Sequence, residues 1–175
     1  MSVDVDAAAI SGRWYKHARA GAPGVERRDP VPDNRWQRGG VVDAIYLADD
    51  EQTVWAEWYR YLAEAGIPPN RALPRDLWEW RLDVRVAHLG DAQRLARVGL
   101  PAPRPGRRGW PAYQAVGEAL AAEGWPGLIA PSAARPDALV LCLFRDASGN
   151  VPDAWPVSPP RRVTDPPAPP TGMTT

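Results

Sequence analysis

The sequence is poor in cysteine and lysine, has no long apolar run, and carries no excess charge of either sign. Its only cysteine, Cys142, rules out an internal disulfide, and the surrounding apolar run, residues 138–144, predicts a buried core thiol rather than a nucleophile. Because 21 basic and 21 acidic residues cancel, the chain lacks the basic surplus typical of nucleic-acid-binding proteins. The N-terminus has neither the basic flank nor the apolar core of a signal peptide, and no run is long enough to span a membrane, so we expect a cytoplasmic protein.

The short motifs of several enzyme classes are missing as well. The sequence has no Gly-x-Gly-x-x-Gly, no phosphate loop with Gly-Lys-Ser, no His-Glu-x-x-His and no paired cysteines. Its two histidines, His17 and His88, show no arrangement that would provide a base for a serine nucleophile. We therefore expect no metal site and no serine-hydrolase chemistry.

An alternation of strand and helix patterns is present, in a chain long enough for one domain. Apolar alternation and short apolar runs bounded by turn residues predict strands, and apolar residues spaced by three and four predict helices. The strands are expected over residues 13–18, 41–48, 76–84, 128–130 and 138–144, and the helices from a cap at Asp49 or Asp50 to Gly66, over 91–98 and over 111–123.

Two segments are predicted to lie outside this pattern. The stretch Leu100–Gly109 is rich in Pro, Gly and Arg, which predicts an exposed basic loop that is solvated or contacts a phosphate or a partner. From Val151 onward the chain is rich in proline and has few apolar residues to offset the entropy of ordering. We therefore expect one folded domain over residues 1–150 and a disordered tail over residues 151–175.

Arg35, Tyr46 and Glu57 follow one another at equal intervals of eleven residues. Glu57 lies in an apolar run, residues 53–60, on the expected helix, where a carboxylate is unusual unless it is solvated, paired or functional. A pair with Arg60, three residues later, is the simpler alternative. The equal spacing brings a cation, a phenol and an acid toward one place, which favours a functional site.

The residues around this triplet indicate further roles. Arg35 precedes a Gly-rich turn, where its planar guanidinium can face a phosphate or carboxylate, and Trp36 beside it can stack on a base or sugar. Tyr46 can equally be a core aromatic whose hydroxyl reaches a partner. Ser132 follows an apolar strand, and it can cap a helix, form a turn or contact a substrate.

These residues, in this order, resemble the RES-domain family, which is named after an arginine, a glutamate and a serine. The resemblance covers roughly residues 12–144, and Lys16 stands where the family has an early strand arginine, while Phe144-Arg145-Asp146 replaces an Asn-Pro ending. The matching segments are Arg35-Trp36 before a Gly-containing turn, Tyr46 in Ala-Ile-Tyr-Leu-Ala, Glu57 in Thr-Val-Trp-Ala-Glu-Trp-Tyr-Arg, Gln114-Ala-Val-Gly117, Gly124-Trp125, and Ser132 in Leu-Ile-Ala-Pro-Ser-Ala.

The resemblance implies a compact α+β domain with a mixed, split sheet and flanking helices, similar to ADP-ribosyltransferases, around a cleft for NAD. It implies a bacterial toxin that degrades NAD by phosphorolysis or hydrolysis of the nicotinamide–ribose bond, with inorganic phosphate as a candidate co-substrate, and that is neutralised by an Xre-type antitoxin. Transfer of ADP-ribose to a protein is the alternative reaction. A non-catalytic protein that binds a nucleotide or an antitoxin is the alternative of another class.

The resemblance also implies a role for each matching residue. Breaking a glycosidic bond to a cationic pyridinium generates an oxocarbenium-like centre, which a nearby carboxylate stabilises, and nicotinamide departs neutral without an acid. The expected roles are pyrophosphate binding by Arg35, assisted by Lys16; positioning of the nicotinamide ribose by Tyr46; charge stabilisation at the anomeric carbon by Glu57; and a hydrogen bond to the substrate from Ser132.

Overall fold

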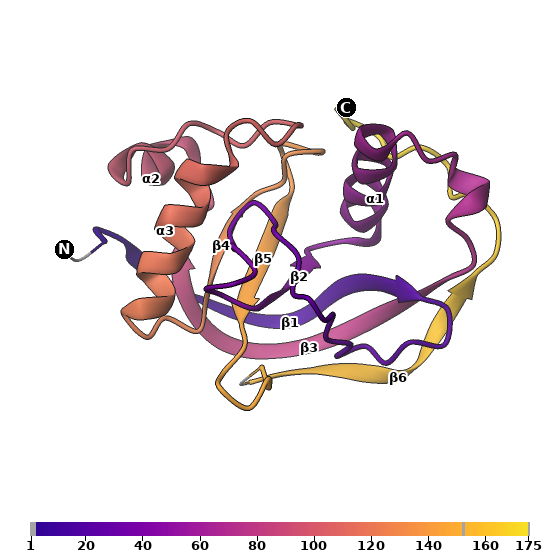
Figure 1. Cartoon of the computed structure of the whole chain (residues 1–175), viewed down its shortest axis with the longest axis horizontal. Helices are drawn as coiled ribbons and strands as arrows, with labels where there is room; N and C mark the ends of the chain where they lie inside the picture. Colours follow the sequence, from indigo (N-terminus) through magenta and orange to yellow (C-terminus); the bar gives the residue numbers. More distant parts are fainter. Residues whose placement is uncertain (1–2, 152, 175) are drawn as a thin grey trace.

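The computed structural model describes residues 3–151 and 153–174 of the chain. Figure 1 shows α1 on one side of the strands and α2 with α3 on the other. The elements, in chain order, are β1 (Asp6–Arg19), β2 (Ala44–Ala48), α1 (Glu51–Ala65), a 3-10 turn (Pro69–Arg71), β3 (Arg75–His88), α2 (Ala92–Arg97), α3 (Trp110–Ala122), β4 (Gly127–Pro131), β5 (Leu139–Phe144) and β6 (Ala154–Val163). The expected α+β class is confirmed.

The six strands form one mixed sheet in the order β1-β2-β5-β4-β3-β6. β1 also pairs antiparallel with β3 over its whole length, so β1, β2, β5, β4 and β3 close into a ring. The pairing of β3 with β4 is parallel, and the other pairings are antiparallel. The mixed strand directions agree with the expectation, but a closed ring replaces the expected split sheet.

Apolar side chains from all five ring strands fill the interior of the ring. One buried cluster contains Trp14 of β1, Leu47 of β2, Trp80 of β3, Ile129 of β4 and Leu141 of β5. A buried aromatic side chain removes roughly 150–250 Å² from water, which at about 25 cal/mol per Å² corresponds to about 4–6 kcal/mol of transfer free energy. This core makes the ring a firm support for the side chains at its rim.

Local signals fix both ends of α1, the helix that carries Glu57. The Asp50 carboxylate accepts a hydrogen bond from the Thr53 backbone N–H at 2.6 Å, and Gly66 ends the helix with a positive φ of 65°. The sequence predicts both caps. Because α1 also buries an apolar face against Ala48 of β2 and Leu77 of β3, the helix and its acid have a fixed position relative to the ring.

The largest departure from expectation is at the C-terminal end. Residues 154–163 form β6, which pairs antiparallel with β3, and Arg162 forms an ion pair with the buried carboxylate of Asp76. The expectation of disorder from Val151 onward is therefore wrong for these residues. Proline is compatible with β6 because the strand lies at the sheet edge, where the missing N–H has no partner to satisfy.

The boundaries of three other strands differ from the expected ones, two by extension and one by shortening. β1 and β3 extend beyond the expected residues 13–18 and 76–84 because they pair with each other along their whole length. β2 begins only at Ala44, so the expected strand over residues 41–48 is too long. Strand ends depend on the partner strand, which is distant in sequence.

Candidate functional site

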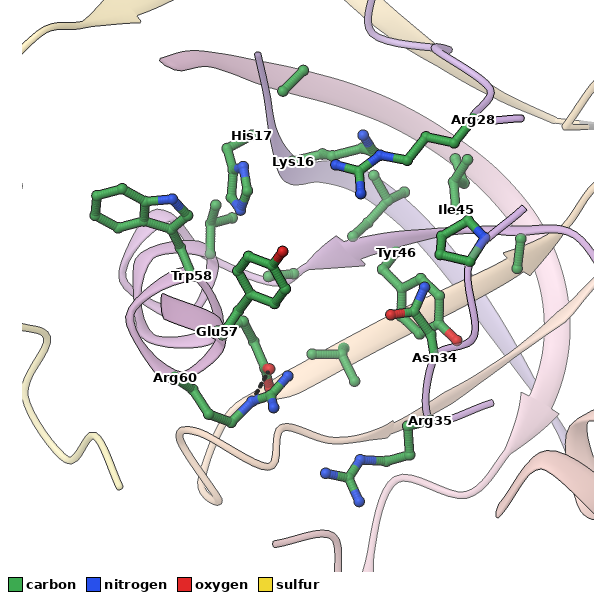
Figure 2. A pocket seen from close by; sticks show the side chains of 18 of the residues that line it. Lys16, His17, Arg28, Asn34, Arg35, Ile45, Tyr46, Glu57, Trp58 and Arg60 are labelled. Atoms are coloured by element: carbon green, nitrogen blue, oxygen red, sulfur yellow. Dashed lines mark hydrogen bonds and ion pairs between the residues drawn. The ribbon is translucent and has the colours of Figure 1, made fainter. Parts of the chain in front are cut away.

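A cavity of about 530 Å³ opens beside α1. Its walls come from β1, the 26–37 segment, β2, α1 and the turn that follows β4. Five of the sequence-predicted site residues line it together, namely Lys16, Arg35, Trp36, Tyr46 and Glu57. Figure 2 shows Glu57 between Lys16 on one side and Arg35 on the other.

The Glu57 carboxylate is held from the turn after β4. Its Oε1 accepts hydrogen bonds from the Ser132 hydroxyl at 2.6 Å and from the backbone N–H groups of Ala133 at 3.1 Å and Ala134 at 3.3 Å. Three donors on one oxygen fix the orientation of the side chain, which is one-quarter exposed toward the cavity. The site therefore presents a preorganised negative charge.

The other oxygen of Glu57 pairs with Arg60. The Arg60 Nε lies 2.9 Å from Glu57 Oε2, and Arg60 also pairs with Glu64 on the next turn. The simple i,i+3 pair considered from the sequence is thus present, and it coexists with the hydrogen bonds from the turn after β4. Glu57 is both paired and turned toward the cavity.

Ser132 lies behind Glu57 and is not part of the cavity wall. Its side chain is fully buried, and its hydroxyl accepts from the backbone N–H groups of Ala134 at 3.2 Å and Arg135 at 3.0 Å while donating to Glu57. The hydroxyl is already committed to these partners, so the expected hydrogen bond to a substrate would require it to leave Glu57. Ser132 acts as a positioning residue for the acid.

Arg135 ties the same turn to the start of α1. Its Nη1 donates to the Asp50 carboxylate at 2.7 Å and to the Thr53 hydroxyl at 2.9 Å. The turn after β4 thus contacts α1 at its N-terminus and again at Glu57. These two attachments fix the distance between the helix and the turn that orients its acid.

Arg35 sits on a turn that α3 holds in place. The Gln114 amide of α3 donates to the backbone carbonyls of Asn34 at 3.0 Å and Gln37 at 3.2 Å. Gly117, one turn later, lets the helix approach so closely that an added Cβ would lie 2.1 Å from the Trp36 carbonyl oxygen. The Gln-x-x-Gly pattern of the sequence therefore positions the arginine.

The Arg35 guanidinium lies over the Tyr113 ring, 5.2 Å from its centroid, and donates to the Arg104 carbonyl at 2.6 Å. The basic loop predicted over residues 100–109 is largely exposed, as expected, and its backbone supports Arg35. Arg35 has no carboxylate within ion-pair distance among the residues that the structure describes. Its charge is available to an anion in the cavity.

Trp36 does not provide a stacking surface. Its indole is 1% exposed, packs edge-on against Tyr113, and belongs to the core cluster under α3. Trp36 contributes to the cavity wall, but its indole has no exposed face on which a base or sugar could stack in this structure. Its backbone N–H instead donates to the Tyr46 hydroxyl at 3.1 Å.

Tyr46 links the core to the cavity. Burial raises the pKa of Tyr46 well above its usual value, so the phenol stays protonated at neutral pH. The hydroxyl accepts from Trp36 and lies against Cys142, whose own pKa burial raises to about 12. Cys142 is fully buried, which confirms its expected core role.

The opposite end of the cavity holds basic residues that no sequence motif brings together. Lys16 and His17 of β1, Arg28 of the following loop and Arg75 of β3 all line the cavity. Burial, followed by repulsion from Arg28 and Arg75, lowers the pKa of Lys16 to about 8. Arg28 and Arg75 are missed by sequence reasoning, because Arg75 approaches Lys16 through the pairing of β1 with β3 and Arg28 through the path of the loop after β1.

The fold and this cavity define a compact α+β domain with a charged site of a size that suits a small ligand. The model of the RES domain matches residues 6–164, and the chain belongs to this family. The match reaches into β6. The resemblance drawn from the sequence is confirmed.

Among solved structures, the fold is similar to a chain of the M. tuberculosis MbcT-MbcA toxin-antitoxin complex, with a TM-score of 0.72, 22% identity and coverage of 86% of each chain. A comparison with curated protein sequences gives no match. Within residues 3–151 and 153–174, no helix is long and apolar enough to cross a membrane.

Proposed function

We propose that this RES domain cleaves NAD at the bond between nicotinamide and ribose, and that it is the toxin of a toxin–antitoxin pair. We also propose that its cavity binds NAD as the cleft of an ADP-ribosyltransferase does. Family membership and the likeness to a chain of a toxin–antitoxin complex support the proposal. The observation that carries it is the Glu57 carboxylate, held by three donors on one oxygen and turned into a cationic cavity.

In the proposed reaction, Glu57 faces the anomeric carbon of the nicotinamide ribose. The C–N bond breaks, its electron pair goes to the ring nitrogen, and nicotinamide leaves as a neutral molecule. The positive charge that develops on the ribose is stabilised by the fixed carboxylate, which needs no reorganisation during the step. Arg35 binds the pyrophosphate, where a planar guanidinium can form two parallel hydrogen bonds. Water, phosphate or a protein side chain completes the transfer.

Replacing Glu57 by glutamine tests this role. Because Gln is nearly isosteric but neutral, we expect Glu57→Gln to lower the rate of nicotinamide release by roughly 100-fold or more, with little change in NAD affinity. Nicotinamide is measured by chromatography and NAD affinity by calorimetry. Glu51→Gln is the matched control, since Glu51 lies on the same helix and pairs with Arg161. Native turnover by Glu57→Gln would rule out the proposed role.

The products distinguish the alternatives. Label from NAD that appears on a protein would indicate ADP-ribosyl transfer in place of cleavage. NAD binding without nicotinamide release would indicate a non-catalytic protein. Incubation with and without inorganic phosphate, followed by identification of the sugar product, shows which small acceptor is used.

A further inference from the structure

The cavity has two cationic ends that differ in their surroundings. At one end, Arg35 interacts with Arg60 and with the carboxylates of Glu57 and Glu64. At the other end, Lys16 lies close to Arg28 and Arg75 (Figure 2 shows Arg28 directed toward Lys16). One end is thus balanced by acids, and the other is almost purely cationic.

The three cations at the second end lack acidic partners. Within the described residues, no carboxylate lies within 4.0 Å of Lys16, Arg28 or Arg75, although fifteen other such pairs are formed. Glu26 acts on Lys16 from a greater distance than 4.0 Å, and it is paired with Arg19. Arg145, which also acts on Lys16, is anchored by Asp43 and by backbone carbonyls.

The remaining groups at this end do not relieve the repulsion. The Nη2 of Arg75 donates to His17 Nδ1 at 2.7 Å, and the buried Nε of Arg75 has no hydrogen-bond acceptor in the described part of the chain. Burial lowers the pKa of His17 well below its usual value, and the charges of Arg75 and Lys16 lower it further, so the ring is neutral. Burial together with Arg28 also lowers the pKa of Arg75. Like charges held together in a partly buried wall are costly unless an anion neutralises them.

We propose that Lys16, Arg28 and Arg75 form a second anion subsite, separate from Arg35, that binds a phosphate group. Two guanidinium groups and one ammonium around a single opening match the three acceptor oxygens of a phosphate. The phosphate comes either from free inorganic phosphate or from a phosphate of the dinucleotide. The existence of the subsite is independent of NAD cleavage, and only its use by a dinucleotide rests on the proposed function.

Titration with inorganic phosphate tests the subsite in the absence of NAD. We expect saturable binding to the full chain, followed by calorimetry or phosphorus NMR, and at least a tenfold weaker affinity for Arg28→Gln and for Lys16→Gln. Arg28 lies on an exposed loop, so that variant keeps the test valid even if the Lys16 substitution impairs folding. Arg13→Gln is the matched control, because Arg13 lies on β1 like Lys16, is exposed and pairs with Glu79 outside the cavity. No saturable phosphate binding, or equal weakening by Arg28→Gln and Arg13→Gln, overturns the proposal.

A second readout follows the lysine directly. Lys16 is the only lysine of the chain, so isotope-labelled methylation gives one lysine signal besides that of the amino terminus. We expect it to titrate with a pKa of about 8 without phosphate and at higher pH when phosphate is added, because a bound anion stabilises the ammonium. A titration that phosphate leaves unchanged contradicts the proposal.

Competition identifies the source of the phosphate. If NAD displaces inorganic phosphate, the subsite binds a phosphate of the dinucleotide. If both bind together, the subsite belongs to the free ion. Both outcomes retain the subsite, and because phosphate binding is measured without turnover, an inactive protein that still binds phosphate would refute the proposed function alone.

Discussion

Glu57 shows how one carboxylate can be paired and still be available for chemistry. Arg60 balances its charge along the helix, while Ser132 and two backbone amides fix its direction from another segment. If Arg60 were its only partner, the Glu57 carboxylate could rotate toward solvent together with the flexible Arg60 side chain. The hydrogen bonds from the turn after β4 prevent this, and Ser132 supplies the shortest of the three.

Replacing Ser132 by alanine tests whether this residue positions the acid. Ser132→Ala removes one donor from Glu57 and leaves the two amide donors, so we expect kcat for NAD cleavage to fall about tenfold with KM nearly unchanged, as for a lost hydrogen bond to a charged group. Steady-state kinetics measure the change, and Ser148→Ala, in an exposed turn, serves as the control. A rise in KM at constant kcat would show that Ser132 contacts the substrate after all.

Residue identity could be predicted from the sequence only where local pattern or family resemblance carried it. Glu57 was found because an acid interrupts an apolar helix, and its pair with Arg60 follows from helix geometry. Arg28 and Arg75 gave no such signal, since Arg75 reaches the cavity through the pairing of β1 with β3 and Arg28 through the path of a loop. The burial of Trp36 could not be predicted, because it depends on Tyr113 of α3, far along the chain.

At the scale of elements, α3 has two functions that its sequence pattern combines. Its apolar face covers the sheet, and its Gln-x-x-Gly pattern holds the turn that carries Arg35. Gly117 is required by close approach and not by backbone conformation, because the helix is regular at this position. The position of Arg35 therefore depends on a helix residue that never meets the cavity.

Replacing Gly117 by alanine tests this dependence, because the sign of the change in the free energy of unfolding shows whether the close approach matters. In an exposed helix, Gly→Ala stabilises by about 1 kcal/mol, whereas here the new methyl would meet the Trp36 carbonyl. We expect Gly117→Ala to lower the free energy of unfolding by about 1–3 kcal/mol and to weaken NAD binding. Denaturant titration and calorimetry measure the two quantities. An increase in stability would show that the segment moves aside without cost.

The elements themselves were predicted with uneven success for a physical reason. The three helices are encoded by caps and periodicity within a few residues, and their expected ranges agree with α1, α2 and α3. Strand limits and β6 were missed because they depend on partners distant in sequence, and the prolines of β6 imitate a disordered segment. Proline excludes a central strand but is compatible with an edge strand.

At the scale of the whole molecule, the end of the chain returns to the site. The Tyr59 hydroxyl of α1 donates to the Pro167 carbonyl, and Pro170 is buried. The Thr174 backbone N–H donates to the Ala134 carbonyl at 2.7 Å, while the Ala134 N–H donates to Glu57. In Figure 1 the chain end lies above α1. The segment after β6 thus supports the outer side of the turn that orients the acid.

A variant that ends at Thr164 therefore tests whether the chain end is needed for the orientation of the Glu57 carboxylate but not for folding. The ring and β6 remain complete, so we expect a cooperatively folded protein, with Tm lower by roughly 2–4 °C for a loss of about 1 kcal/mol. We also expect several-fold lower kcat, because Ala134 and Arg135 lose their contacts to Thr174 and Thr171. Thermal melting by circular dichroism and NAD kinetics measure both effects, and Tyr59→Phe, which removes only the contact to Pro167, should change Tm more than kcat. Unchanged kcat in the shortened chain would mean that the turn after β4 holds Glu57 without help from the chain end.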